Sequence, residues 1–369
     1  MKPSRKLKQL SLILRAIPMI CLTALAVQAI AQPITTPRTA SPAASMTQTI
    51  GISTVTVHYS RPAVKGRQIW GALVPYGWNV EGFGARKEAP WRAGANENTV
   101  IVFSHPVKVE GTTVPAGSYG LFFTVNADNT GEVVLSKDHQ SWGSYWYDPA
   151  NDQLRAKIKL REIPHTEFLT YDFINLTKNT GELVLNWEKK QFPVKLEFAV
   201  DEIVMTNAEQ ELKGPAGFTP QGFISAASYA LQNNVNHEKA MGWIDQALAQ
   251  NNSFATKQIK AGLLKQAGNT AEGDKLMQEA MATGTETELN NYGYQLLGQG
   301  THDTAIEVFV LNTERFPKSA NAWDSLGEAY ATKGDKSNAI KCFKRSLGLN
   351  PAANVKANSE KFLKQLGAM

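Results

Sequence analysis

The polar residues best suited to chemistry gather in one irregular stretch, residues 59–99. We select Arg61, Lys65, Arg67, Arg92 and Glu97 from this stretch. A guanidinium group donates two parallel hydrogen bonds to a carboxylate or a phosphate, so this cluster indicates recognition of an anion. The alternative is a structural network, in which Arg92 pairs with Glu97 and nearby asparagine side chains bond to the loop backbone.

Aromatic residues accompany this polar cluster. Trp91 lies within it, and Trp142 and Tyr145 follow further along the chain. Such rings offer flat apolar faces on which a sugar or a peptide can stack. A long stretch rich in Trp, Arg and Gly differs in composition from a disordered segment, and we therefore interpret residues 59–99 as a structured binding loop.

The sequence contains no familiar catalytic or cofactor motif. It has no H-E-x-x-H, G-x-S-x-G, P-loop or dinucleotide-binding glycine pattern, and its six histidines are scattered without metal-ligand spacing. We therefore predict no cofactor and no metal. The enzymatic alternative is a hydrolase of envelope material that uses Glu97 or Asp148 as acid or base, with an arginine stabilising charge. A third hypothesis is a purely structural envelope module.

Charge argues against a nucleic-acid partner. Five of the 38 basic residues lie among the first 31 residues, which contain no Asp or Glu. Without them, basic and acidic residues balance at 33 each. A nucleic-acid-binding protein needs a surplus of positive charge, so we exclude that class.

The first 31 residues are typical of a secretory signal peptide. A basic segment ends at Arg15, an apolar run covers 16–30, and Ala29 and Ala31 supply the small residues at a cleavage site. We predict cleavage after Ala31, a flexible tether over 32–45, no membrane anchor afterwards, and a periplasmic or secreted protein. Cys342 is then the one cysteine of the mature chain, which excludes an internal disulfide.

Residues 46–204 are predicted to form an all-β domain. Residues 54–59 and 155–160 alternate as half-buried strands do, and glycine-containing turn signals separate the remaining runs. Many short strands at this spacing favour an antiparallel β-sandwich or jelly roll. The predicted strands are 54–59, 100–103, 107–110, 119–125, 132–135, 155–160, 167–173, 182–187 and 194–200.

Short motifs in this part of the chain resemble DUF2911, a bacterial envelope family of unknown function. The resemblance covers about residues 41–200, and it implies a secreted β-domain without a catalytic assignment. Residues 78–90 form a longer connection between two motifs than the family usually has. The motifs are SRP at 60–62, KGR at 65–67, LVPYG at 73–77, WRAGANENT at 91–99, PAGSYGL at 115–121, and WGSY at 142–145 followed by YD at 147–148.

The second half of the chain has a helical pattern with a period of 34 residues. A linker is predicted over 205–220, helical repeats over 221–353 and a capping helix over 354–369. The pattern resembles the tetratricopeptide repeat (TPR), with small residues where helices approach and large ones between them. The residues assigned to this packing are Gly293, Ala305, Phe309, Trp323, Leu326, Gly327, Tyr330, Ala339, Phe343 and Pro351. Weaker copies cover 221–254 and 255–285.

Together these patterns predict a β-domain followed by an all-α, TPR-like helical repeat array. The function that we expect is binding. The β-domain would recognise an anionic, carbohydrate or peptide ligand, and the repeats would hold a protein or peptide partner in their groove.

Overall fold

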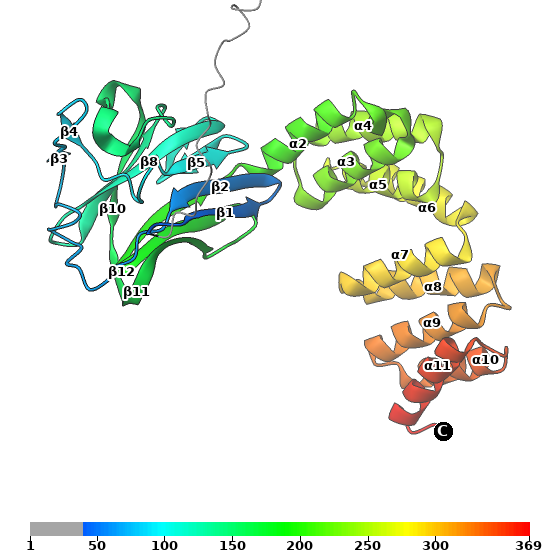
Figure 1. Ribbon diagram of the computed structural model, residues 1–369. Helices are drawn as coiled ribbons and strands as arrows, with labels where there is room; N and C mark the ends of the chain where they lie inside the picture. The colour runs from blue at the N-terminus through cyan, green and yellow to red at the C-terminus, as the bar shows by residue number, and fades with distance from the viewer. Residues whose placement is uncertain (1–39) are drawn as a thin grey trace, which may run out of the picture. The chain divides into compact units, whose positions relative to one another are not determined.

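The computed structural model describes residues 40–369, which form two compact units (Figure 1). The first unit ends at Glu197 and the second covers Phe198–Met369. The predicted signal peptide and residues 32–39 of the predicted tether lie outside the described residues. Within residues 40–369, no helix is both long and apolar enough to span a bilayer.

The first unit contains two antiparallel sheets and a small ribbon. The six-stranded sheet has the order β1-β2-β5-β8-β9-β10, the four-stranded sheet has the order β11-β12-β6-β7, and β3 pairs with β4. The strands are β1 (Ala43–Ile50), β2 (Ser53–Ser60), β3 (Asn79–Val80), β4 (Glu88–Ala89), β5 (Val100–Phe103), β6 (Val107–Val109), β7 (Thr112–Val114), β8 (Gly117–Val125), β9 (Thr130–Ser136), β10 (Asp152–Lys159), β11 (Arg161–Ile174) and β12 (Thr180–Glu197). Two short 3-10 helices, η1 (Gly143–Trp146) and η2 (Pro149–Asn151), precede β10.

Alternating apolar residues build the core between these sheets. On β2, Val55 and Val57 are fully buried while the residues between them are not, as the sequence pattern predicted. The sheets contact each other through aromatic rings: Phe123 of β8 lies 5.3 Å from Phe192 of β12, centroid to centroid. The predicted antiparallel β-domain is confirmed.

Two features of this domain differ from the predictions. The predicted tether, 32–45, overlaps β1, which begins at Ala43 and pairs with β2 along its whole length. β1 is polar and lies at the sheet edge, so backbone pairing rather than an apolar pattern determines it. The predicted runs 182–187 and 194–200 belong mainly to one strand, β12, in which Glu188 has a left-handed backbone (φ 52°) and the pairing register shifts.

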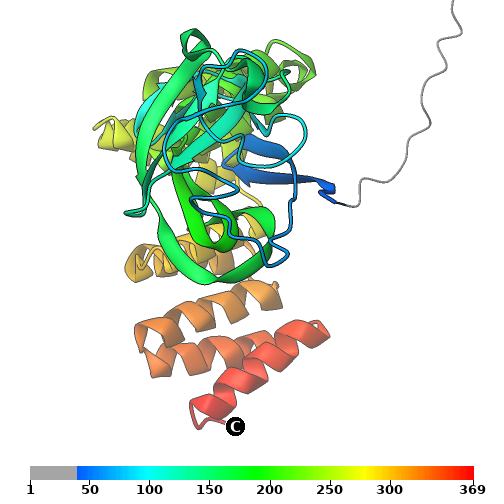
Figure 2. The same ribbon diagram turned by 60° about the vertical axis from the view of Figure 1, so that its left-hand side comes forward.

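The second unit is a series of helices. They are α2 (Val200–Glu211), α3 (Pro220–Asn233), α4 (His237–Gln250), α5 (Phe254–Gln266), α6 (Thr270–Thr283), α7 (Glu286–Gly298), α8 (His302–Arg315), α9 (Ala320–Lys333), α10 (Lys336–Leu347) and α11 (Ala353–Gln365), with a 3-10 helix η3 (Pro215–Phe218). Figures 1 and 2 both show α7–α11 stacked in succession. The prediction of helices after the β-domain is confirmed.

The predicted linker, 205–220, requires correction. Most of α2 and all of η3 lie in this range, and the β-domain does not continue to residue 204 because α2 begins at Val200. Met205 explains the helix: it is buried and packs in one cluster with Phe223 and Ala227. The polar composition of the following residues conceals this apolar anchor.

The 34-residue period corresponds to repeated packing contacts. A methyl group on Gly293 would lie 2.6 Å from the Phe309 ring, and one on Gly327 would lie 2.8 Å from the Phe343 ring. Only glycine permits each ring to press on the facing helix. The helix pair α7–α8 and the helix pair α9–α10 therefore use the same joint.

A second contact also repeats. The Asn312 side chain donates to the Glu286 carbonyl at 3.2 Å, and the Ser346 hydroxyl donates to the Ala320 carbonyl at 2.8 Å. Both donors lie on the second helix of a pair and both acceptors at the start of the first. Helix α11 then covers the last pair, where Phe362 stacks on Phe343 with ring centroids 5.1 Å apart.

Candidate functional site

The candidate site is a pocket of about 590 Å³ in the β-domain. It is formed largely by the irregular stretch 62–96, with Tyr145 from η1 and Trp187 from β12 completing its wall. Lys65, Arg67 and Arg92 are its cationic lining residues, and Glu81 is its carboxylate. This volume lies in the range of ordinary small-molecule sites.

The first wall of the pocket is held by backbone contacts. Val64 donates its N–H to the Glu167 carbonyl at 2.8 Å, and the Lys65 N–H donates to the Glu167 carboxylate at 2.9 Å. The Arg67 guanidinium donates to the carbonyls of Ala63 (2.5 Å) and Val64 (3.1 Å), so it closes its own turn. Lys65 has a left-handed backbone (φ 48°), which is unusual for a residue with a side chain.

Trp91 anchors the base of the pocket. Its backbone exchanges two hydrogen bonds with Phe123 at 2.8 and 2.9 Å. Its ring stacks on Trp187 at 5.7 Å between centroids, with 15° between the planes, and meets Trp70 edge-on at 5.9 Å. Three indoles thus hold the residue next to Arg92 in a fixed position.

The Arg92 side chain is oriented on three sides. Its Nη1 donates to the Asn96 carbonyl at 2.7 Å, and its guanidinium carbon lies 4.9 Å from the centre of the Tyr145 ring. Its guanidinium group also lies against Gly143, where a methyl group would come within 2.3 Å of it. A stacked and singly bonded guanidinium keeps donors for a ligand, since arginine has five N–H groups.

The pocket is electrostatically positive. Among the described residues, no carboxylate forms an ion pair with Lys65, Arg67 or Arg92, and Glu81 forms none either. The lining therefore combines three cations with one unpaired carboxylate. Such an arrangement attracts an anion and leaves one separate acceptor.

Trp187 adds an unusual polar group. The residue is 1% exposed and lines the pocket, and its Nε1 has no hydrogen-bond acceptor among the residues that the structure describes. A buried N–H without an acceptor is costly, and such groups require an explanation.

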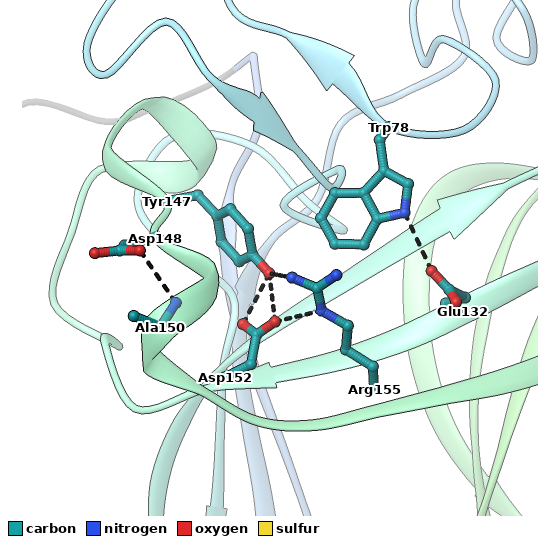
Figure 3. A network of polar contacts seen from close by, with 7 residues as sticks. All are labelled: Trp78, Glu132, Tyr147, Asp148, Ala150, Asp152 and Arg155. Carbon is teal, nitrogen blue, oxygen red and sulfur yellow. Dashed lines mark hydrogen bonds and ion pairs between the residues drawn. The ribbon is translucent and has the colours of Figure 1, made fainter.

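A polar network beside the pocket supports the segment that carries Asn79 and Glu81. Trp78 Nε1 donates to Glu132 at 3.1 Å, and the Arg155 guanidinium lies over the Trp78 ring at 4.4 Å (Figure 3). Arg155 in turn pairs with Asp152, which accepts from the Tyr147 hydroxyl at 2.7 Å.

Burial, and then the hydrogen bond to Asp152, raise the pKa of Tyr147 well above its ordinary value. This tyrosine therefore keeps its proton and acts as a fixed donor. Figure 3 also places Asp148 in this region, where it accepts from the Ala150 N–H at 3.1 Å.

The structure brings together five of the eight predicted ligand-binding residues. Those five line the pocket: Lys65, Arg67, Trp91, Arg92 and Tyr145.

The other three predicted residues lie elsewhere. Arg61 does not line the pocket, because its guanidinium donates to the Leu169 carbonyl (3.0 Å) and the Thr170 hydroxyl (2.6 Å). Glu97 lies beside His58 in a shallower depression, and Trp142 is half exposed outside the pocket.

The carboxylates of the hydrolase hypothesis are not in this pocket. Glu97 lies in the separate depression, and Asp148 is exposed and caps η2. Within residues 40–369, no three His, Cys, Asp or Glu side chains gather as a metal site.

Sequence reasoning missed Glu81 and Trp187. Glu81 lies in the lengthened connection 78–90, and its acidic type within a basic loop is a usable signal. Trp187 is more than 90 residues from Trp91 in the chain, and nothing in its neighbourhood marks it as different from a core residue.

Comparisons with known proteins agree with this division of the chain. Mouse Superkiller complex protein 3 is 34% identical over 74 residues, 20% of this chain and 5% of that protein. Its human counterpart is 37% identical over 59 residues, 16% of this chain and 4% of that protein. The chain therefore matches only a small fraction of the length of these relatives.

Solved structures give weak similarities. YrrB, described as a TPR protein with an unusual peptide-binding site, is 16% identical, with 44% of this chain and 84% of that chain covered and a TM-score of 0.27. PilF of Pseudomonas aeruginosa is 20% identical, with 41% and 71% covered and a TM-score of 0.27. Residues 41–196, which contain nearly the whole pocket, match the model of DUF2911, a family described as a protein of unknown function.

Proposed function

We propose that this chain is a secreted or periplasmic binding protein, in which the β-domain binds a small anionic ligand and the helical repeats bind a protein or peptide. The ligand occupies the pocket that Lys65, Arg67 and Arg92 line. The observation that carries the proposal is Arg92, a guanidinium held in place by Asn96 and Tyr145 without a carboxylate partner among the described residues.

Positioning in advance supports binding. An arginine that must be immobilised by its ligand loses side-chain entropy on binding, whereas Arg92 is already held in a single arrangement. Lys65 and Asn96 also have left-handed backbones at the pocket (φ 48° and 63°). Strain of this kind gathers where a loop must hold a specific shape, and it therefore favours a functional pocket.

The repeat array supports the second part of the proposal. The first helices of successive pairs join through polar side chains: Gln258 donates to Gln295 at 2.8 Å, and Tyr294 donates to Glu328 at 3.0 Å. These residues are largely exposed, so the array presents a continuous polar and aromatic surface. Helical repeats use surfaces of this kind to hold peptides.

The proposed location rests on the first 31 residues alone. Their basic, apolar and small-residue segments follow the order of a cleaved export signal. Export would give the pocket access to envelope material. Sequencing the amino terminus of protein purified from its natural compartment should yield Gln32, whereas an intact Met1 would contradict export.

Thermal unfolding tests the pocket. The mature chain should be melted with acetate, inorganic phosphate, acidic sugars and short acidic peptides. A ligand at one hundred times its Kd stabilises the folded state by about 2.7 kcal/mol, which corresponds to a rise in melting temperature of roughly 5–10 °C for a domain of this size.

Two variants locate the binding. Arg92→Gln should abolish the rise in melting temperature. Arg86→Gln should retain it, because Arg86 is an exposed arginine of the same stretch that does not line the pocket. An anion that stabilises both variants equally would place the site elsewhere, and the absence of any stabilising anion would reject the proposal for the β-domain.

A further inference from the structure

The pocket lining contains more than an anion site requires. Glu81 is a carboxylate inside a cationic pocket, yet it forms no ion pair with the described residues. An ionised carboxylate accepts hydrogen bonds and cannot donate them. It repels a purely anionic ligand such as phosphate, but it accepts hydrogen bonds from hydroxyl groups.

The indoles point to the same kind of ligand. Trp91 is partly exposed in the pocket and held rigid by Trp187 and Phe123. An indole face packs well against the C–H face of a sugar ring. The Trp187 Nε1 has no acceptor among the described residues, so an oxygen of a pocket ligand would satisfy a group that is otherwise unpaired.

We propose that the pocket binds a sugar acid, a hexose ring that carries a carboxylate. This inference rests on the proposed anion-binding function and narrows its ligand class. The carboxylate accepts hydrogen bonds from the Arg92 guanidinium, the ring lies against Trp91, and ring hydroxyls donate to Glu81. A ring or hydroxyl oxygen accepts from Trp187.

Volume is consistent with this class. A pocket of about 590 Å³ exceeds what one carboxylate group or one phosphate fills. It accommodates a hexose ring with its substituents, and the polar side chains of Asn79 and Asn96 in the lining serve as further partners for hydroxyls.

Calorimetric titration of the mature chain provides the test. The ligands are glucuronate and galacturonate, their neutral counterparts glucose and galactose, and acetate. Each sugar acid should bind at least about tenfold tighter than either its neutral counterpart or acetate, since a charge-assisted pair and a stacked ring each contribute. A trimer of galacturonate, titrated in parallel, distinguishes a polymeric source of the sugar acid from a free one.

Two substitutions assign the contacts. Arg92→Gln should weaken glucuronate binding about tenfold or more and leave glucose binding unchanged. Glu81→Gln should weaken glucuronate but strengthen acetate, because it removes a hydroxyl acceptor and a repulsive charge together. Arg86→Gln is the matched control and should change neither affinity.

The outcomes separate this inference from the proposed function. If phosphate or acetate binds as tightly as the sugar acids and still depends on Arg92, the sugar-acid inference fails while anion binding stands. If no anion binds, both fail.

Should Arg92→Gln not fold, the indole N–H resonance of Trp187 in the wild-type chain remains as a readout. It should shift on saturation with glucuronate. An unmoved resonance would overturn the inference, and would indicate that the N–H faces the ring of Trp70, which lies edge-on 5.9 Å away.

Discussion

Replacing one helical glycine with alanine should have opposite effects in two helices of the repeat array. Gly293 of α7 faces the ring of Phe309, and an added methyl group would lie 2.6–2.8 Å from three ring atoms. Phe309 is fully buried and therefore cannot move aside. Gly242 lies on an exposed part of α4, where no atom comes within 4 Å of the added methyl group.

The magnitudes follow from two competing terms. Overpacking a rigid core costs about 1–3 kcal/mol, whereas alanine gains about 1 kcal/mol over glycine within a helix. For Gly293→Ala the contact is severe, so the net loss should be about 1–2 kcal/mol. For Gly242→Ala only the gain remains, about 0.5–1 kcal/mol.

Urea unfolding followed by circular dichroism at 222 nm measures both changes. The midpoint should fall for Gly293→Ala and rise for Gly242→Ala, with the dependence on urea concentration unchanged. Gly327→Ala, at the equivalent position against Phe343, should behave like Gly293→Ala. A midpoint that rises equally for Gly293→Ala and Gly242→Ala would refute the proposed close packing at the repeated joint.

Further predictions concern ionisable groups. Burial raises the pKa of Asp324 above 3.8, so its contribution to stability is full below that pH and is lost as the pH rises through the raised pKa. The wild type should therefore lose stability relative to Asp324→Asn as the pH rises from 4 to 7 in urea titrations. The hydrogen bond from Arg161 lowers the pKa of Glu182 below 4.5, so this contribution is present above pH 4.5 and lost as the pH falls. Arg161→Gln should cost about 1 kcal/mol at pH 7 and progressively less under acid, again by urea titration. Burial raises the pKa of Cys342 to about 11, so a thiol reagent at pH 8 should label the mature chain only after it is unfolded.

Strands with one buried face could be predicted from the sequence. The alternation at Val55 and Val57 reports burial directly, and β2 forms where that alternation predicts. β1 carries no such pattern because its place is determined by backbone pairing with β2. Helix α2 likewise rests on the single buried anchor Met205, which the 34-residue period does not reach.

The site was predictable by residue type but not by direction. Arg61 and Arg92 have equal potential in the sequence, but Arg61 turns to residues more than 100 positions away on β11. Glu97 follows Arg92 closely, yet left-handed backbones at Ala93 and Asn96 (φ 51° and 63°) redirect the chain between them. Local spacing does not encode such reversals when the residues involved are not glycine.

The repeated joint also bears on how this chain can change in length. Each pair from α7 onward presents to its neighbour the same glycine–phenylalanine contact and the same donor to the leading carbonyl. A duplication or deletion of one 34-residue unit within this region would leave each remaining interface with its partner, provided that α11 stays last to cover Phe343. The β-domain has no such freedom, because its pocket draws Trp91 and Trp187 from distant strands and loops. The helical half can therefore lengthen or shorten by recombination, while the pocket can change only by substitution.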